Sequence, residues 1–349
     1  MKRKVWLIAL GVVPVLLFCT CLAICGIAGA LWWDGTTPQL TSAHALQEPT
    51  LNLGSARQPP TPAEEETARL LSSASLPQRD LAALSQRLEG LSESLNVEPP
   101  GDPPDYQIGD ALDFWIHDLQ TVSYYTTTAI LRYETPHAYW WIEEGYDVAA
   151  ESLKRSAERF ETQTYPIGHQ YFGSEWSPGV DGDPHIFIFL GRVEGAGGYF
   201  SVDDEYPVAV RPHSNQHEMF YINLDNASPG SAYFDGILAH EFQHMIHFAM
   251  DRDEDAWVSE GLSELAAQVT GHDVGGSDYA FSRAPDTQLT TWTALEDAAP
   301  HYGASYLFLT YFLEQYGEQA VRQLVAEPAN GTSGFDAVLA RIDPVSYTH

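Results

Sequence analysis

The sequence predicts a mixed α+β protein with two lobes, a mixed β-sheet followed by a mainly α-helical part, preceded by one transmembrane helix near the amino terminus. Three observations lead to this prediction. Residues 106 to about 230 alternate between strand and helix patterns, residues 233–250 form one long helical run, and the chain after Glu264 is helical in pattern. Strands that precede helices in this way indicate a sheet with the helices segregated to one side.

Segments rich in β-branched and aromatic residues predict the strands of this sheet. They occupy residues 122–133, 138–142, 185–190 and 219–223. Residues 146–164 between them have a helical pattern. In the second half, residues 303–317 predict a helix that stops at a glycine, as many helices do.

The long helical run Tyr233–Met250 contains a His-Glu-x-x-His motif. Its two histidines, His240 and His244, lie about 40° apart around a helix and about 6 Å apart along it. Both imidazoles can therefore reach one metal ion, with Glu241 beside them as a base. Because the flanking residues are apolar, the helix is predicted to be buried, and a buried charged Glu241 is costly unless it is paired or near a metal.

A third ligand is expected further along the chain, because a catalytic zinc takes three protein ligands and leaves one position for water. Residues 257–264 read W-V-S-E-G-L-S-E and supply two carboxylates. Glu260 follows His244 by 16 positions (260 − 244), and Glu264 lies one helical turn further on the same face. Glu260 is the natural third ligand, although spacing alone leaves the choice between the two open.

These two segments, A-H-E-F-Q-H-M-I-H-F at 239–248 and W-V-S-E-G-L-S-E at 257–264, resemble the hyicolysin-like family of zinc metallopeptidases, part of the wider gluzincin group. The resemblance covers about residues 106–320 and is most specific between 195 and 265. Upstream segments that look like the same family are 171–176, 197–200 and 214–223. The resemblance implies a zincin-type, two-lobed metallopeptidase fold with the His-Glu-x-x-His helix next to the sheet.

The resemblance also implies roles for individual residues. His240, His244 and Glu260 would be the zinc ligands, and Glu241 the catalytic base. Gluzincins in general place a second carboxylate four residues after the ligating one, where it accepts the outer N–H of a ligating histidine. On this chain that second carboxylate is Glu264.

Zincin resemblance further implies an edge strand beside the cleft that pairs with an extended peptide. The segment Gly195–Phe200 would supply it through Gly197, Gly198 and Tyr199, because glycines allow close approach of two backbones. The residues alone are equally compatible with a flexible hairpin.

Three further polar residues are candidates for positions in or near the site. Tyr302 and His301, just before the helix at 303–317, are candidates for the group that stabilises the oxyanion, and Tyr302 is the one we assign a catalytic role. His247 lies on the same stripe as the motif histidines but a further turn along. A straight helix cannot bring all three histidines to one ion, so we predict that His247 lies behind the ligands or on the surface.

Composition restricts the partners and the setting. The chain of 349 residues has a formal net charge of −31, which disfavours nucleic acid and anionic membrane surfaces as electrostatic partners. Its three cysteines, Cys19, Cys21 and Cys25, all precede residue 34, so the remainder forms no disulfide and a thiol mechanism is excluded. The expected partners are protein or peptide substrates, and the sequence does not determine an oligomeric state.

The chain divides into three predicted segments, 1–33, 34–105 and 106–349. Residues 5–33 are an uncharged apolar run after Met-Lys-Arg-Lys, longer than the roughly 20 residues that span a bilayer. We favour an uncleaved signal-anchor over a cleaved signal peptide, with the domain outside the cytoplasm in either case. Residues 34–105 form a linker rich in Pro, Ser and Thr with short amphipathic helices, which would act as a spacer or, alternatively, a propeptide.

Two details of these segments are specific. Thr61-Pro62-Ala63-Glu64 predicts a helix start, and leucines repeat at 3-4-3-4 spacing from Leu81 to Leu95. Residues 106–349 form the predicted zinc metallopeptidase domain, whose carboxy-terminal lobe we expect to be truncated.

The function predicted from the sequence is that of an exported zinc-dependent metalloendopeptidase, in which Zn²⁺ activates a water molecule and Glu241 is the general base. One alternative is a catalytically inactive zincin-fold protein that binds a partner at the cell surface. Another is a membrane-anchored assembly module with a structural zinc, which would normally need four protein ligands. The sequence does not separate endo- from exo-cleavage.

Overall fold

The structure is a computed structural model that describes residues 61–73, 84–85, 87–88, 103–272, 275–292 and 297–342. It falls into two compact units, residues 1–75 and 76–349. The predicted span at 5–33 and most of the leucine repeat at 81–95 lie outside the described residues. Among the helices of the described part, none is both long enough and apolar enough to cross a membrane.

In the first unit, helix α2 (Pro62–Ser73) starts where the sequence predicts. The hydroxyl of Thr61 accepts a hydrogen bond from the backbone N–H of Glu64 at 3.3 Å, and the Glu64 carboxylate accepts one from the Thr61 N–H at 2.6 Å. This reciprocal pair satisfies two backbone donors at the helix start, which confirms the predicted capping box.

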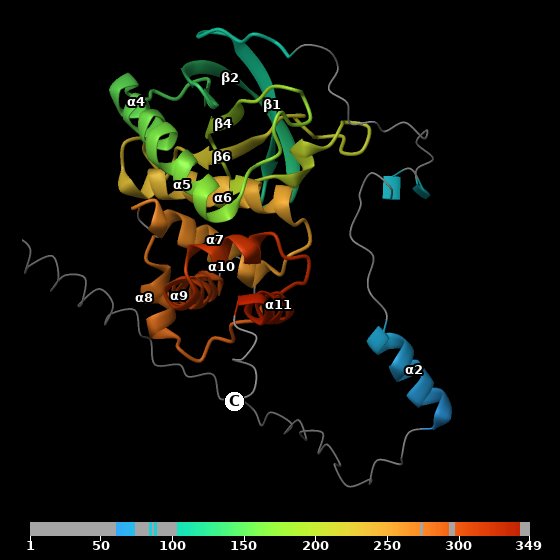
Figure 1. Ribbon diagram of the computed structural model, residues 1–349. Helices are drawn as coiled ribbons and strands as arrows, with labels where there is room; N and C mark the ends of the chain where they lie inside the picture. Colours follow the sequence, from blue (N-terminus) through green and yellow to red (C-terminus); the bar gives the residue numbers. More distant parts are fainter. Residues whose placement is uncertain are drawn as a thin grey trace, which may run out of the picture. The chain divides into compact units, whose positions relative to one another are not determined.

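The second unit contains a mixed sheet whose described strands follow the order β1-β2-β3-β4-β6-β5 (Figure 1). Neighbouring strands pair antiparallel except β3 with β4 and β4 with β6, which pair parallel. The strands are β1 (Ala111–Asp118), β2 (Ser123–Thr135), β3 (Ala138–Glu143), β4 (Ile186–Gly191), β5 (Gly198–Phe200) and β6 (Met219–Asn223). The mixed sheet predicted from the sequence is confirmed, and β5 forms one of its edges.

The central strands are buried on both faces, which explains their continuous apolar sequences. Side chains alternate between the faces along each strand. Trp140, Ile188 and Phe220 face the helices and join the larger hydrophobic core, while Trp141 and Phe189 belong to a second core on the opposite face. The sheet is therefore a rigid support whose edge strand β5 is held at a fixed position.

One predicted helix differs from the observed one at both ends. Residues 146–164 were expected to form a single helix, but α4 spans Ala150–Arg159 and continues through a π-helical turn η1 (Phe160–Thr164) into α5 (Tyr165–Phe172). Pro166 directly follows this π-helical turn, in the first turn of α5, and the run stays helical through it although proline lacks a backbone N–H. The chain therefore stays helical beyond the predicted end.

The remaining helices follow the sheet in sequence, and in Figure 1 all of them except α6 lie below it. The described ones are α6 (Ala232–Met250), α7 (Ala256–Val269), α8 (Ser277–Arg283), α9 (Ala299–Tyr316), α10 (Glu318–Val325) and α11 (Thr332–Ile342). Helix α6 contacts β5 and β6 on one side and α7 on the other. It begins with Ser231, whose hydroxyl accepts the N–H of Phe234 at 3.1 Å, a standard N-cap. The predicted helix at 233–250 is thus confirmed as α6, which lies between the sheet and helix α7.

A buried carboxylate fixes the start of α6 against α4. Asp235 is 1% exposed, accepts a hydrogen bond from the Ser156 hydroxyl at 2.6 Å and forms an ion pair with Arg159. Its position in the first turn also suits the positive end of the helix dipole. The Ser156–Asp235–Arg159 contacts therefore set the position of the helix that carries His240 and His244.

We predict that Asp235→Ala lowers the free energy of unfolding by about 1–3 kcal/mol, because it leaves buried donors without their acceptor. Urea denaturation of the variant and the parent protein measures this loss. The control is Asp286→Ala, at an exposed carboxylate, which is expected to change stability by less than about 0.5 kcal/mol. Equal stability of the two variants would contradict the role given to Asp235.

Candidate metal centre

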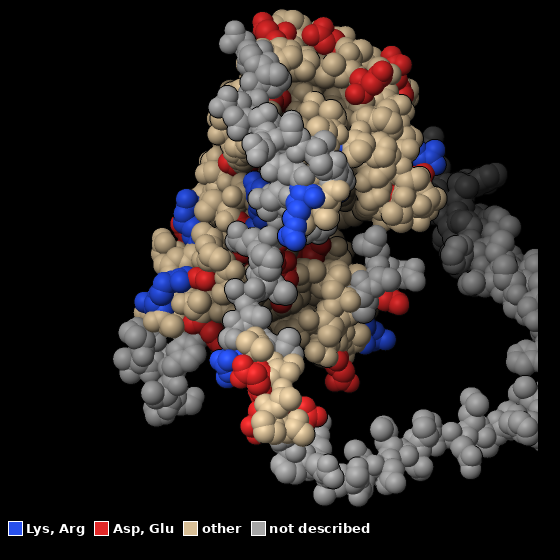
Figure 2. Space-filling view, turned by 90° about the vertical axis from the view of Figure 1, so that its right-hand side faces the viewer, with Lys and Arg blue, Asp and Glu red and all other residues tan. Residues whose placement is uncertain are grey.

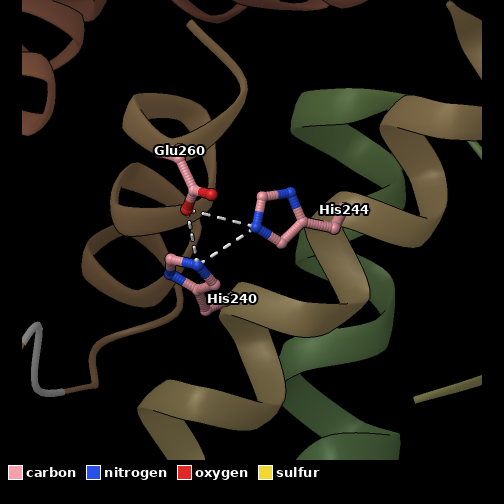
Figure 3. Close-up of side chains that lie close together, drawn as sticks. All are labelled: His240, His244 and Glu260. Carbon is pink, nitrogen blue, oxygen red and sulfur yellow. Dashed lines mark hydrogen bonds and ion pairs between the residues drawn. The ribbon is translucent and has the colours of Figure 1, made fainter. Parts of the chain in front are cut away.

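Helices α6 and α7 bring His240, His244 and Glu260 together (Figure 3). The Nε2 atoms of the two histidines are 3.2 Å apart, and each lies 3.3 Å from Oε2 of Glu260. The two histidines are one turn apart on α6, while Glu260 comes from the second turn of α7, which packs beside it. Among the described residues this is the one group of three or more His, Cys, Asp or Glu side chains arranged to hold a metal ion.

The spacing of the three atoms suits a tetrahedral ion. Bonds of about 2.0–2.1 Å to zinc place neighbouring ligand atoms of a tetrahedron about 3.3 Å apart. The observed separations are 3.2, 3.3 and 3.3 Å. In addition, Glu260 Oε2 is buried and has no hydrogen-bond partner among the described residues. A buried carboxylate oxygen that faces two imidazole nitrogens without a hydrogen bond is what a divalent cation would complete.

The outer nitrogens of both histidines also have neighbours. Nδ1 of His240 lies 3.4 Å from Oε1 of Glu264, whose other oxygen accepts a hydrogen bond from the Ser277 hydroxyl at 2.7 Å. Nδ1 of His244 lies 3.1 Å from the hydroxyl oxygen of Ser263. With the proton of each ring on Nδ1, both Nε2 lone pairs face Glu260, so three electron-pair donors converge without a hydrogen between them.

The hydrogen bonds around His244 fix this protonation state. The Ser263 hydroxyl donates to Oε1 of Gln243 at 2.5 Å, so its oxygen is left to accept the Nδ1–H of His244. A second hydroxyl, that of Ser259, lies 3.2 Å from the same nitrogen. Neither serine was predicted from the sequence to lie in the site. Their spacing could have indicated this position. Residues at i and i+4 lie on one face of a helix, so Ser259 and Ser263 share a face next to Glu260.

The electrostatics of the cluster favour positive charge at its centre. Burial disfavours a proton on His240, yet Glu260 and Glu264 raise the pKa of that imidazole well above its usual value. Burial alone would raise the pKa of Glu260, but the two histidines lower it below the usual range, so the carboxylate is ionised. An ionised carboxylate beside two imidazoles is a suitable donor set for Zn²⁺, which on binding would displace the proton that His240 holds at Nε2.

Glu241 lies next to this cluster and under the edge strand. It is 5% exposed, and the backbone N–H of Phe200 in β5 interacts with its carboxylate. Burial raises the pKa of Glu241, an effect that His240 and His244 partly offset. The carboxylate thus stands between the metal-binding atoms and β5, where a proton acceptor is useful.

The glycines of the edge strand allow this close approach. A Cβ atom on Gly198 would lie 2.7 Å from Cγ2 of Ile237, 2.7 Å from the carbonyl oxygen of Tyr221 and 3.1 Å from Oε1 of Glu241. Any larger residue would push β5 away from α6. Tyr199 behaves differently, since its ring stacks on Tyr221 with centroids 4.2 Å apart, so the side chain supports the sheet. Gly195–Phe200 is therefore an edge strand at its carboxy-terminal end and not a flexible hairpin.

Two cavities meet at Glu241. The first, of about 520 Å³, extends along the carboxy-terminal half of α6 as far as Asp251. The second, of about 330 Å³, extends along the amino-terminal half as far as Tyr233. Residues lining both are Ala196, Gly198, His240, Glu241 and Tyr302. The candidate metal centre therefore lies in the middle of an elongated cleft between β5 and α9.

The structure distinguishes the two residues expected to stabilise the oxyanion, Tyr302 and His301. Tyr302 lines both cavities, and its ring centroid lies 6.2 Å from that of His240. Burial and the carboxylate of Glu260 raise the pKa of the Tyr302 hydroxyl, which keeps it a hydrogen-bond donor. His301 is buried, packs against Trp292 with ring centroids 5.7 Å apart and lines neither cavity.

His247 lies outside the group of three, as its position one turn beyond His244 predicts. It is not a surface residue, however, because it is only 2% exposed. Both ring nitrogens are buried without a hydrogen-bond partner in the described part of the chain, and the residue lines the first cavity. Burial lowers the pKa of His247 to about 3, so the ring is neutral.

Charged side chains are unevenly distributed on the surface. Asp and Glu number 48 against 17 Lys and Arg in the chain, and in Figure 2 carboxylates gather at the upper end, which the sheet forms. Basic side chains on that face are scattered. The exclusion of nucleic acid as a partner stays a prediction.

Among the comparisons with known proteins, the one with solved structures gives matches. No family model and no curated protein matches the chain. Similar solved structures include the M1 zinc metallopeptidase from Deinococcus radiodurans and a mutant of it with one glutamate replaced by alanine. Each matches at 11% identity and a TM-score of 0.36, covering 68% of this chain. This chain spans 58% of the length of those structures. Membership of the hyicolysin-like family stays a prediction.

Proposed function

We propose that this protein is a zinc-dependent metalloendopeptidase. The observation that carries the proposal is the convergence of two Nε2 atoms and one carboxylate oxygen at 3.2–3.3 Å, next to the buried carboxylate of Glu241 in an open cleft. The arrangement of a mixed sheet, the motif helix at its boundary and helices beyond it fits a two-lobed zincin-type fold. The motifs at 239–248 and 257–264 favour the hyicolysin-like family of zinc metallopeptidases.

In this proposal the residues of the site have different roles. His240, His244 and Glu260 would hold Zn²⁺, which when bound supplies a Lewis acid that activates water and polarises a carbonyl. Glu241 accepts the proton of the attacking water and passes it to the leaving amine nitrogen. The hydroxyl of Tyr302 donates a hydrogen bond to the carbonyl oxygen as negative charge develops on it.

The cleft suits an extended peptide. Strand β5 pairs with β6 through one edge, where the carbonyl of Gly197 accepts the N–H of Asn223. Because backbone groups alternate along a strand, Gly198 turns its N–H and carbonyl to the other edge, which is left to pair with a substrate backbone. The two cavities extend in opposite directions from Glu241. A peptide can therefore continue on both sides of the scissile bond, which is the geometry that an endopeptidase requires.

The proposal predicts that a chelator abolishes hydrolysis of an internally quenched peptide and that about one equivalent of zinc per chain restores it. The reason is that three ligands build one site, so activity follows its occupancy. The measurement is a zinc titration of the chelated full-length protein, with peptide cleavage and bound zinc followed together. Full activity in the zinc-free protein would contradict the proposal, as would zinc binding without cleavage of any peptide.

We also propose that the domain lies outside the cytoplasm, tethered by residues 5–33 or released by their cleavage. Lys2, Arg3 and Lys4 support this orientation, because positive residues favour the cytoplasmic side. Protease added to intact cells is expected to degrade the tethered domain, whereas a released domain is found in the medium. A cell-bound domain that resists added protease until the cells are lysed would reverse the orientation.

A further inference from the structure

We infer that the first cavity binds a positively charged side chain of the substrate, a lysine or arginine on the amino-terminal side of the scissile bond. The inference rests on the proposed function and adds the substrate class. We call the end of this cavity that is formed by His247, Asp251 and Glu254 the acidic subsite.

The acidic subsite is continuous with the candidate metal centre. The same cavity of about 520 Å³ is lined by His240, Glu241 and Glu260 at one end and by Asp251 and Glu254 at the other. Asp251 follows the last turn of α6, and Glu254 lies two residues before α7. A side chain of a peptide held at Glu241 can therefore reach these carboxylates without leaving the cavity.

The subsite contains carboxylate oxygens that nothing in the described part of the chain satisfies. Asp251 is 8% exposed, and its Oδ2 is buried without a hydrogen-bond partner. Oε2 of Glu254 is in the same situation, although Oε1 accepts backbone N–H groups of Asp255 at 2.6 Å and Gly331 at 2.7 Å. Those two hydrogen bonds hold the Glu254 carboxylate in place. Unpartnered buried carboxylate oxygens are costly, so a ligand that donates hydrogen bonds to them gains affinity.

His247 adds a neutral polar group to the same wall. It is 2% exposed, both its ring nitrogens lack partners among the described residues, and its backbone carbonyl accepts the N–H of Asp251 at 2.7 Å. A neutral imidazole offers one acceptor nitrogen. Ammonium and guanidinium groups carry several N–H donors and no acceptor, so they match three acceptors better than a hydroxyl or an amide does.

The charge balance of the subsite also favours a cation. Burial raises the pKa of Asp251, and it also raises the pKa of Glu254, the latter to about 7, so a bound cation would stabilise the ionised form of each carboxylate. Arg252 lines the cavity too, but its guanidinium carbon lies 5.0 Å over the ring of Phe248 and the residue is exposed. Its charge acts on Glu205, whose pKa it lowers against a larger effect of burial.

The apolar part of the cavity suits the stem of a long side chain. Between the metal centre and the acidic subsite the walls include Phe200, Val202 and Phe248. Lysine and arginine bury their methylene groups along apolar surfaces while the charged end reaches polar partners. The cavity thus offers apolar walls for the methylene groups and acceptors for the charged end.

The direction of β5 assigns the subsite to one side of the scissile bond. β5 runs from Gly198 to Phe200, and the acidic subsite lies beyond Phe200. A peptide that adds to the free edge of β5 in the antiparallel direction runs the opposite way. Residues that precede the scissile bond therefore lie at the Phe200 end, next to the acidic subsite.

The test compares kcat/KM for matched internally quenched peptides that differ at one position before the cleaved bond, with lysine, arginine, norleucine or glutamate there. All peptides are acetylated, so that a free terminal amine does not supply the positive charge. The zinc-loaded full-length protein is expected to prefer lysine or arginine over norleucine by about 10-fold to 100-fold, the range of a hydrogen bond to a charged group. Mass spectrometry of the products establishes which bond is cleaved.

Two variants connect the preference to the subsite. Asp251→Asn and Glu254→Gln keep the shape of each side chain and remove its charge, so each is expected to reduce the lysine-to-norleucine ratio by about tenfold. The matched control Asp286→Asn removes an exposed carboxylate outside both cavities and is expected to leave the ratio unchanged.

The outcomes separate this inference from the proposed function. Cleavage of all the peptides without preference for a cationic residue, or with an unchanged ratio in both variants, would overturn the inference and leave the peptidase proposal standing. A cationic preference at a position after the cleaved bond would also overturn it. Failure of the zinc-loaded protein to cleave any peptide would instead overturn the proposed function.

Discussion

Replacing Glu241 by glutamine is expected to lower kcat by about 100-fold to 10,000-fold, the usual contribution of a general base, while zinc content stays at about one ion per chain. The carboxylate is not one of the three converging ligand atoms, yet it lines both cavities beside them. Glutamine keeps the volume of the side chain but cannot accept and pass on a proton. The measurement is steady-state hydrolysis of a quenched peptide together with zinc analysis of the same sample.

A matched control for this variant is Glu314→Gln, which makes the same chemical change at an exposed position of α9. It is expected to retain full activity and full zinc content. If Glu241→Gln hydrolysed peptides as fast as the unaltered protein, Glu241 would not be the base. If it lost its zinc, the residue would belong to the metal site.

A second large effect is expected on zinc affinity, and it distinguishes the role of Glu260 from that of Glu264. Oε2 of Glu260 faces both Nε2 atoms at 3.3 Å, whereas Oε1 of Glu264 lies 3.4 Å from Nδ1 of His240, on the outer side of that ring. Glu260→Gln is therefore expected to give essentially zinc-free protein. Glu264→Gln should bind zinc about 10-fold to 100-fold more weakly, the usual effect of losing a partner behind a ligand. Competition with a chromogenic zinc chelator measures both affinities.

The outcome that would contradict this assignment is an exchange of the two phenotypes, with Glu264→Gln zinc-free and Glu260→Gln only weakened. Far-ultraviolet circular dichroism of each variant shows whether the helical content of the protein is retained. Glu314→Gln again serves as the control that keeps both its fold and its zinc affinity.

The elements that carry the candidate site were predictable because their signals are local. The apolar run around His240 and His244 predicts a helix at 233–250 from short-range sequence alone, and α6 spans Ala232–Met250. Likewise, the aromatic and β-branched run at 219–223 forms β6, which is buried on both faces. Spacing left Glu260 and Glu264 open, and the packing of α7 against α6 places them at different nitrogens of His240.

Features that depend on distant contacts were not predictable. Strand β1 was missed because its sequence, A-L-D-F-W-I-H-D, has only two fully buried side chains, Phe114 and Ile116, and its pairing with β2 gives it its structure. The burial of His247 and the open acceptors of Asp251 and Glu254 arise where α6, its following turn and α7 enclose a cavity. No pattern of residues close together in the sequence predicts that a cavity forms there.

X-ray absorption at the zinc edge tests the central claim most directly, because it reports the ligands of the bound ion. Zinc-loaded full-length protein is expected to contain about one zinc per chain, with four nitrogen or oxygen neighbours at about 2.0–2.1 Å and outer-shell scattering from two imidazoles. His240→Ala should remove that signal together with most of the zinc. Less than stoichiometric zinc, or a zinc environment without imidazole that is unaffected by His240→Ala, would contradict the metal centre described here.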